Sequence, residues 1–107
     1  MSIEIEGIVS SVDGARELDQ KGMMSLHLTL RPWRRHDSRD NELGTAIVTV
    51  FSDLDYVDAW MNGLDPGKCL RVMCTSVSGA DENGNVTVEA HGEPLRPCPD
   101  EWSGASN

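Results

Sequence analysis

Apolar and polar residues alternate along much of this chain, and that period of two predicts β-strands. The clearest run covers residues 23–33. Its apolar positions are Met24, Leu26, Leu28 and Leu30, and its polar positions include Ser25, His27, Thr29 and Arg31. Such a strand has one face in a core and the other in water. Pro32 cannot donate to a sheet ladder, so it places the far end of this strand at an edge or an exit.

The first strand is predicted over residues 3–12, and its alternation slips by one position at Gly7. The apolar positions are Ile3 and Ile5 before the glycine and Ile8 and Val12 after it. A β-bulge produces such a slip, and it lets a long strand curve as a barrel requires. Asp13 and Gly14 then predict a turn, so residues 15–22 are expected to connect to the second strand.

A third strand over residues 45–51 is followed by a change of period that predicts one short helix. The inward positions of the strand are Ala46, Val48 and Val50, and the helical stripe is Leu54, Val57, Met61 and Leu64. Ser52 is the expected N-cap, and Gly63 is placed to end the helix. The sequence 65–67, Asp-Pro-Gly, turns the chain back toward strand.

Two more strands are predicted over residues 69–78 and 85–91, the latter with Val86, Val88 and Ala90 facing inward. The remaining tail, residues 93–107, is rich in proline and small polar residues and is expected to be extended or disordered. Trp102 within it either packs back on the domain or docks on a partner. The predicted organisation is one folded domain over residues 1–92 and a C-terminal tail.

The cysteines and the absence of a long apolar run favour a cytoplasmic protein. Cys69 and Cys74 lie five residues apart in one predicted strand and point to opposite faces, so they cannot pair with each other. Three unpaired thiols suit a reducing compartment. We expect no metal or other cofactor, because His27, His36 and His91 have no recognised ligand spacing. No serine has an identifiable base, so an enzyme is not expected.

Charge is distributed unevenly along the chain. The net charge is −9, yet residues 31–39 hold four arginines and one acid. The arginines are Arg31, Arg34, Arg35 and Arg39. One interpretation is a solvated loop whose charge offsets nearby acids. The other is an anion-binding arm, in which the arginines contact phosphates and an exposed Trp33 stacks on a base.

Five strands with a helix between the third and fourth is the order of the five-stranded Greek-key barrel called the OB-fold. The stretches EIEGIVSSV, SLHLTLRP, TAIVTVFS, DPGKCLRVMCTSV and NVTVEA give the chain a pattern that resembles bacterial single-stranded DNA-binding proteins and the related primosomal replication proteins. The resemblance spans about residues 3–92. It implies single-strand binding on the face of strands two and three and their connecting loop. By position, those residues are Arg31, Trp33, Arg34, Arg35, Arg39, Thr45, Thr49 and Phe51.

The function expected from these observations is weak, non-catalytic binding of single-stranded DNA or RNA, by a protein that forms a homodimer. Segregation of the basic loop from the acidic remainder is what would allow phosphate binding at this net charge. The alternative is an acidic protein-interaction module, a DNA mimic or a regulatory subunit, with no nucleic-acid binding. Its support is the acidic set Glu4, Glu6, Asp53, Asp55 and Asp58.

Overall fold

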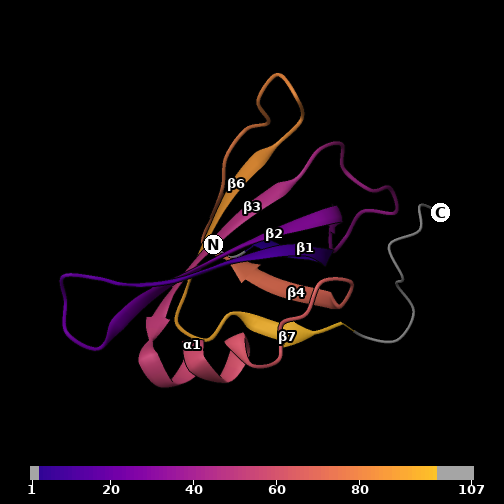
Figure 1. The fold of residues 1–107 in the computed structure, drawn as a ribbon. Coiled ribbons are helices and arrows are strands. Elements are labelled where there is room, and N and C mark those ends of the chain that lie inside the picture. The colour runs from indigo at the N-terminus through magenta and orange to yellow at the C-terminus, as the bar shows by residue number, and fades with distance from the viewer. Residues whose placement is uncertain (1–2, 99–107) are drawn as a thin grey trace.

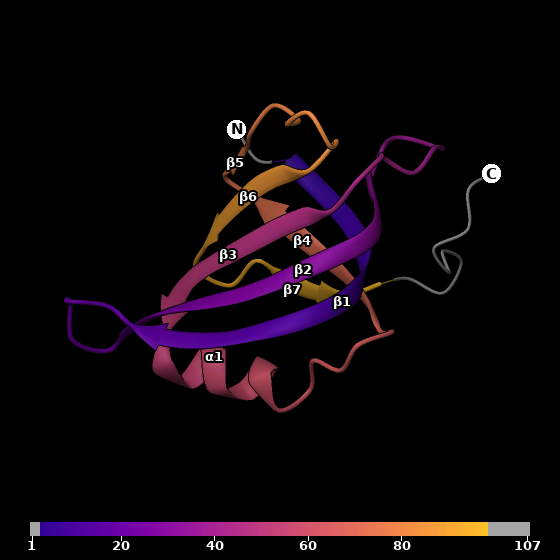
Figure 2. The same cartoon turned by 45° about the horizontal axis from the view of Figure 1, so that its top comes forward.

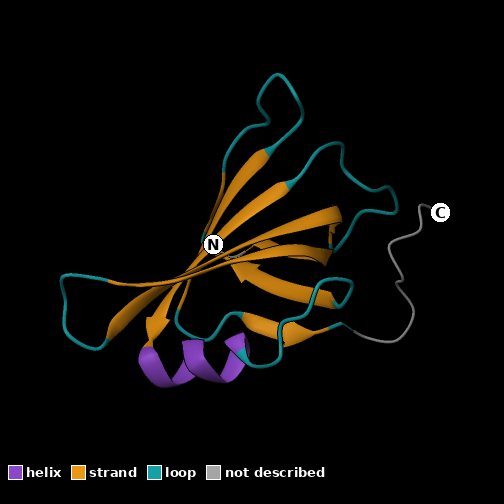
Figure 3. Ribbon diagram, viewed as in Figure 1, coloured by secondary structure: helices purple, strands orange, loops and turns teal. Residues whose placement is uncertain are grey.

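The computed structural model describes residues 3–98 of the chain. Within this range the chain forms seven β-strands and one short helix (Figures 1 and 3). In chain order the elements are β1 (Ile3–Glu17), β2 (Met23–Arg35), β3 (Ala46–Asp53), α1 (Leu54–Met61), β4 (Cys69–Cys74), β5 (Ser76–Val77), β6 (Val86–His91) and β7 (Leu95–Pro97). The all-β class is confirmed, and so is the helix after the third strand. The predicted number of five strands is wrong, because the described residues form seven.

The strands form one strongly curled sheet in the order β5-β6-β3-β2-β1-β4-β7 (Figure 2). β1 lies between β2 and β4 and pairs antiparallel with both, whereas β3 and β6 pair in parallel. α1 packs against β2 and β3 at one end of the curled sheet (Figure 1). Eighteen buried apolar side chains fill the concave side, among them Leu26, Leu28, Leu30, Val48, Val50 and Val88.

The bulge predicted at Gly7 of the first strand is wrong, because β1 pairs with β4 without a shift from Ile3 to Ile8, and Ile5 and Val9 both face the core. The register shift between Gly7 and Val9 comes from an extra residue on β2, whereas β1 carries the extra residue at the two later shifts, Val9/Ser11 and Val12/Gly14. A Cβ atom on Gly7 would lie 2.7 Å from the Leu30 Cβ and 3.0 Å from the Trp33 Cβ, so only glycine fits this crossing. The turn predicted at Asp13 and Gly14 is wrong. β1 continues through Gly14, which has a φ of 110° opposite a further register shift, and the chain turns only at residues 18–22.

The helix forms where the change of period predicts it, but its N-cap is Asp53 instead of Ser52. The Asp53 carboxylate accepts a hydrogen bond of 2.8 Å from the Tyr56 backbone N–H. Ser52 still belongs to β3, and its hydroxyl donates to the Gly92 carbonyl oxygen. Both residue types are good N-caps. Because Ser52 is still paired with Met24 of β2, the helix can begin only after Asp53, the last residue of β3.

The fourth predicted strand is divided, and the chain beyond residue 92 continues the sheet. Thr75 separates β4 from β5, and β5 pairs with β6. β7 pairs with the outer edge of β4, and the Leu95 backbone N–H donates to the Tyr56 hydroxyl at 2.8 Å. Residues 99–107, with Trp102, lie outside the described residues.

A disulfide joins Cys69 at the start of β4 to Cys98 after β7, with their Cα atoms 5.5 Å apart. The prediction of three unpaired thiols is therefore wrong, and the argument for a reducing compartment loses its premise. The spacing of Cys69 and Cys74 does exclude a bond between those two, but β7 brings Cys98 beside β4 and so within reach of Cys69. Cys74 stays a free thiol in the core, and burial raises its pKa to about 12.

Across residues 3–98, no helix has the length and apolar character needed to span a membrane.

Candidate functional site

The convex side of β2, β3 and β6 carries a stripe of polar and aromatic side chains, with one exposed aliphatic residue, Ile47, in three cross-strand rows. From β2 through β3 to β6, the rows are Ser25 with Phe51 and His91, His27 with Thr49 and Glu89, and Thr29 with Ile47 and Thr87. Neighbouring residues on each strand point into the core, which fixes these positions on the other face. We call these nine residues the outer stripe.

The outer stripe is locally organised by side-chain contacts. Phe51 and His91 stack with their ring centroids 5.0 Å apart and an angle of 27° between the ring planes. The Ser25 hydroxyl lies 2.8 Å from His27 Nε2, which orients that imidazole along the stripe. Thr29 shares a 2.8 Å hydrogen bond with Ser11 of β1. The stripe thus offers one aromatic stack, the His27 imidazole and threonine hydroxyls on a rigid sheet, whereas Ser25 is 4% exposed and supports His27 from below.

A pocket of about 380 Å³ lies at the end of the stripe where β2 begins and β3 and β6 end. Its lining residues are Met23, Phe51, Ser52, Asp53, His91, Gly92 and Glu93. The stacked aromatic pair therefore forms part of its wall, and two exposed carboxylates stand at its rim. In size it falls within the range of pockets that hold small organic groups.

Of the four predicted arginines, two are committed to carboxylates. Arg34 Nη2 lies 3.6 Å from Glu6 Oε1, and the Arg34 side chain is only 15% exposed. Arg35 Nε lies 3.7 Å from Glu42 Oε1 in a half-exposed pair. Each of these charges is already offset by an acid, so neither arginine is well placed to bind a phosphate.

The other two arginines, Arg31 and Arg39, are exposed, and neither has an ion pair among residues 3–98. Arg31 follows Leu30 on β2, so it extends the outer stripe at the end opposite the pocket. Arg39 lies in the loop between β2 and β3. That loop is anchored where Gly44, with a φ of 78°, passes so close to the Gly84 backbone that a Cβ would collide with it.

Glu6 is the centre of a buried charge cluster that the sequence did not indicate. Its side chain is 2% exposed and lies between Arg34 on β2 and Arg71 on β4. His36 Nδ1 is 3.2 Å from Glu6 Oε1, and Arg71 Nε is 2.7 Å from Glu4 Oε1. The signs are balanced across three strands, so the cluster ties the strands together and offers little net charge to a ligand.

Trp33, predicted to be an exposed stacking surface, is 1% exposed. The cause is a register shift near Pro32. Leu30 of β2 is opposite Val9 of β1, and Trp33 is opposite Gly7, so β2 has one extra residue between these two pairs. The shift moves Trp33 to the core side. The prediction that it stacks on a base is therefore wrong, whereas Thr49 and Phe51 do lie on the outer face.

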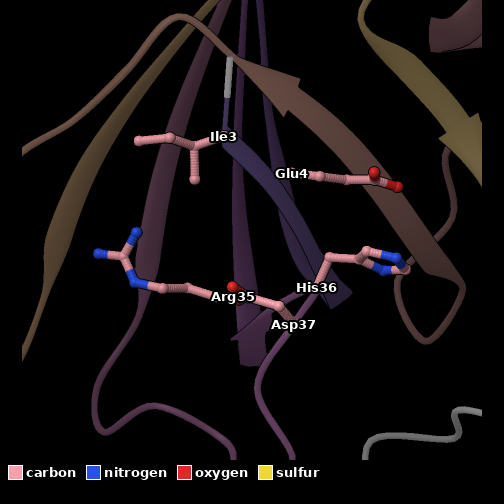
Figure 4. A pocket seen from close by; sticks show the side chains of 5 residues that line it. All are labelled: Ile3, Glu4, Arg35, His36 and Asp37. Carbon is pink, nitrogen blue, oxygen red and sulfur yellow. The ribbon is translucent and has the colours of Figure 1, made fainter. Parts of the chain in front are cut away.

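A second pocket, of about 390 Å³, lies where β1 begins and β2 ends, away from the outer stripe (Figure 4). In Figure 4 the Arg35 guanidinium extends to one side, and Glu4 and His36 lie on the other. Asp37 adds a second acid to the lining. Because both signs of charge are present, this pocket has no clear preference for an anion or a cation.

The predicted site contains only Thr49 and Phe51 of the nine stripe residues. His91 is the most consequential of the others, and a signal for it was available. It follows Ala90, the last inward residue of the fifth predicted strand, so alternation places it outside. Its stacking on Phe51 depends on the parallel pairing of β3 with β6, which local periodicity does not reveal.

Compared with protein-family models and with curated protein sequences, the chain has no significant match.

Proposed function

We propose that this protein binds single-stranded nucleic acid weakly and without catalysis, along the outer stripe. The observation that carries the proposal is the stripe itself, with its stacked pair Phe51 and His91 at one end and the exposed Arg31 at the other. Aromatic faces stack on bases and unpaired arginines contact phosphates, and these are the two interactions on which single-strand binding depends.

The strand pairing supports an OB-type Greek-key barrel related to the bacterial single-stranded DNA-binding and primosomal proteins. β1 pairs with both β2 and β4, β3 pairs in parallel with β6, and α1 stands between β3 and β4. In this proposal β5 continues the fourth barrel strand after a break, and β7 is an addition at the edge of β4. OB-folds bind oligonucleotides on the face that includes strands two and three, which here is the outer stripe.

Length and charge limit the expected site. The stripe from Arg31 to the pocket residue Met23 follows nine residues of β2, roughly 26 Å, which suits the lower part of the ~4–16 nucleotides bound per OB-fold. Glu89 lies in the middle row and repels phosphate. Two phosphate contacts, through Arg31 and Arg39, give a slope of log affinity against log salt of about −1.4 for a single strand.

A homodimer is part of the proposal, because a second copy would double the number of exposed arginines that one strand can reach. The sheet edges in the described chain are short, since β5 has two residues and β7 has three. Light scattering during the titration tests this part: a mass of twice the chain supports the dimer, and a monomer at binding concentrations rules it out.

The test is fluorescence anisotropy of a labelled single strand of mixed sequence at two salt concentrations, with a duplex of equal length as control. We expect salt-sensitive binding to the single strand alone. R31A/R39A should weaken it and reduce the salt slope by about 1.4. The matched control is K68A/R96A, which removes two exposed positive charges away from the stripe. Equal effects of the two double variants would refute a role of the stripe.

Absence of binding at low salt would contradict the proposal and favour the acidic interaction module instead. The exposed acids of α1, Asp55 and Asp58, are its most accessible candidates. A partner that carries a basic surface would then be the class of protein to seek.

A further inference from the structure

We propose that the pocket at the end of the outer stripe holds one base of the bound strand and selects bases that carry an exocyclic amino group over thymine and uracil. This inference rests on the proposed function and adds a base preference to it. It assigns the aromatic pair Phe51 and His91 to stacking, and the carboxylates of Asp53 and Glu93 to selection.

The pocket belongs to the same face as the stripe. Met23 is opposite Asp53 in the pairing of β2 with β3, and Phe51 is opposite His91 in the pairing of β3 with β6. Alternation places Met23, Phe51 and Asp53 on the convex side, because the intervening residues point inward. A strand that follows the stripe from Arg31 therefore ends at this pocket.

The rim is held in place before any ligand arrives. The Gly92 backbone N–H donates to the Phe51 carbonyl oxygen at 3.0 Å, and the Ser52 hydroxyl donates to the Gly92 carbonyl oxygen at 2.5 Å. Asp53 is fixed by the 2.8 Å hydrogen bond that its Oδ1 accepts from Tyr56, which leaves Oδ2 for another donor. A site fixed in this way loses little entropy when it binds.

The charge of the lining determines which part of a nucleotide enters. No lysine or arginine lines the pocket among the described residues, and Asp53 and Glu93 are both exposed at its rim. Phosphate is repelled by two carboxylates, whereas an uncharged base can stack on the aromatic wall. The base therefore enters and its phosphates stay on the side toward Arg31.

Hydrogen-bond chemistry then separates the bases. An ionised carboxylate only accepts hydrogen bonds, so it pairs with N–H groups and repels carbonyl oxygens. Cytosine and adenine each present an amino group, and guanine presents an amino group beside a ring N–H. Thymine and uracil carry a carbonyl oxygen, O4, at the position where cytosine carries its amino group. Their one N–H on this edge, the ring N3–H, is flanked by two carbonyl oxygens that a carboxylate repels. The expected preference is therefore for amino-bearing bases.

The experiment compares oligo-dC with oligo-dT of equal length at neutral pH, by anisotropy with the full chain. We expect oligo-dC to bind about tenfold more tightly, the size of one good hydrogen-bonded discrimination between bases. In D53N/E93Q each carboxylate becomes an amide that can also donate, so the ratio should fall to near one, mainly through tighter binding of oligo-dT. Asparagine is also a good N-cap, so α1 is retained in this variant.

The matched control is D55N/D58N, which removes two acidic charges from α1 outside the pocket. It should strengthen binding of both oligonucleotides equally and leave their ratio unchanged. Equal affinity of the wild-type protein for the two oligonucleotides, or a ratio that D53N/E93Q leaves intact, would overturn the inference while the proposed function stands. Absence of binding to either one would overturn both.

Discussion

Removal of the Cys69–Cys98 disulfide should cost this protein a large part of its stability. The two cysteines are 29 residues apart in the sequence, and their bond attaches β7 to the edge of β4. In the chain-entropy description, a loop of this length restricts the unfolded state by about 3.5 kcal/mol at room temperature. We therefore expect C69S/C98S to unfold with a free energy lower by about 3 kcal/mol.

Two contacts of β7 determine how much of this strand stays in place when the disulfide is removed. Leu95 is buried, and the Tyr56 hydroxyl accepts a hydrogen bond from its backbone N–H, so β7 retains contacts without the disulfide. With an m-value of about 1.5 kcal/mol/M, the urea midpoint should fall by about 2 M. Hydrogen exchange should accelerate most at the backbone N–H groups of β7 and the facing edge of β4.

The assay is urea unfolding of the wild-type protein with and without a dithiol reductant, beside C69S/C98S. Reduction should lower the wild-type midpoint to that of the variant and leave the variant unchanged. Thiol titration of the unreduced, denatured protein should find one free cysteine, Cys74. In the native state that thiol should not react, because burial raises its pKa to about 12. Three titratable thiols, or a urea midpoint of the unreduced wild-type protein equal to that of C69S/C98S, would refute the reasoning.

Two further predictions concern the strand crossing around β1. R34A should destabilise the protein by about 1–3 kcal/mol, since it removes a partner of the buried Glu6 carboxylate, whereas R35A, from a half-exposed pair, should cost under about 1 kcal/mol. Equal urea midpoints for these two variants would contradict that assignment. G7A should cost about 1–3 kcal/mol, because the new Cβ would meet the Leu30 Cβ at 2.7 Å, and a thermal midpoint like that of the wild-type protein would argue against the close crossing.

Most of the strands could be predicted because their burial follows a strict period of two. Leu26, Leu28 and Leu30 of β2 and Val86, Val88 and Ala90 of β6 all face the core as alternation predicts. The helix was found from its change of period. Local signals were sufficient here because each element has one buried face.

The errors lie where tertiary pairing overrides a local signal. The register shift at Pro32 brings Trp33 to the core and removes it from the predicted site. The local signal at Asp13 and Gly14 predicts a turn, but Gly14 pairs with His27 of β2 and therefore belongs to β1. Cys98 follows three residues of strand that form only because β4 offers an edge, so its pairing with Cys69 has no local signature.

The candidate site was predicted in part. Thr49 and Phe51 lie on the outer face, and Arg31 and Arg39 are exposed, as the pattern indicates. Arg34 belongs to a charge cluster whose members come from three strands. The sequence does not predict that Glu6 of β1 and Arg71 of β4 lie beside Arg34. The pocket residue His91 likewise joins β3 only through the parallel pairing, and Glu93 follows beyond the end of β6.

The central claim is that single strands bind along the outer stripe, and backbone amide NMR during titration with a single-stranded oligonucleotide tests it most directly. We expect the largest shift changes at Thr29, Thr49, Phe51 and His91, with smaller changes on α1 and β7. Changes centred on α1 or on the pocket beside Arg35, or no changes at low salt, would contradict the account.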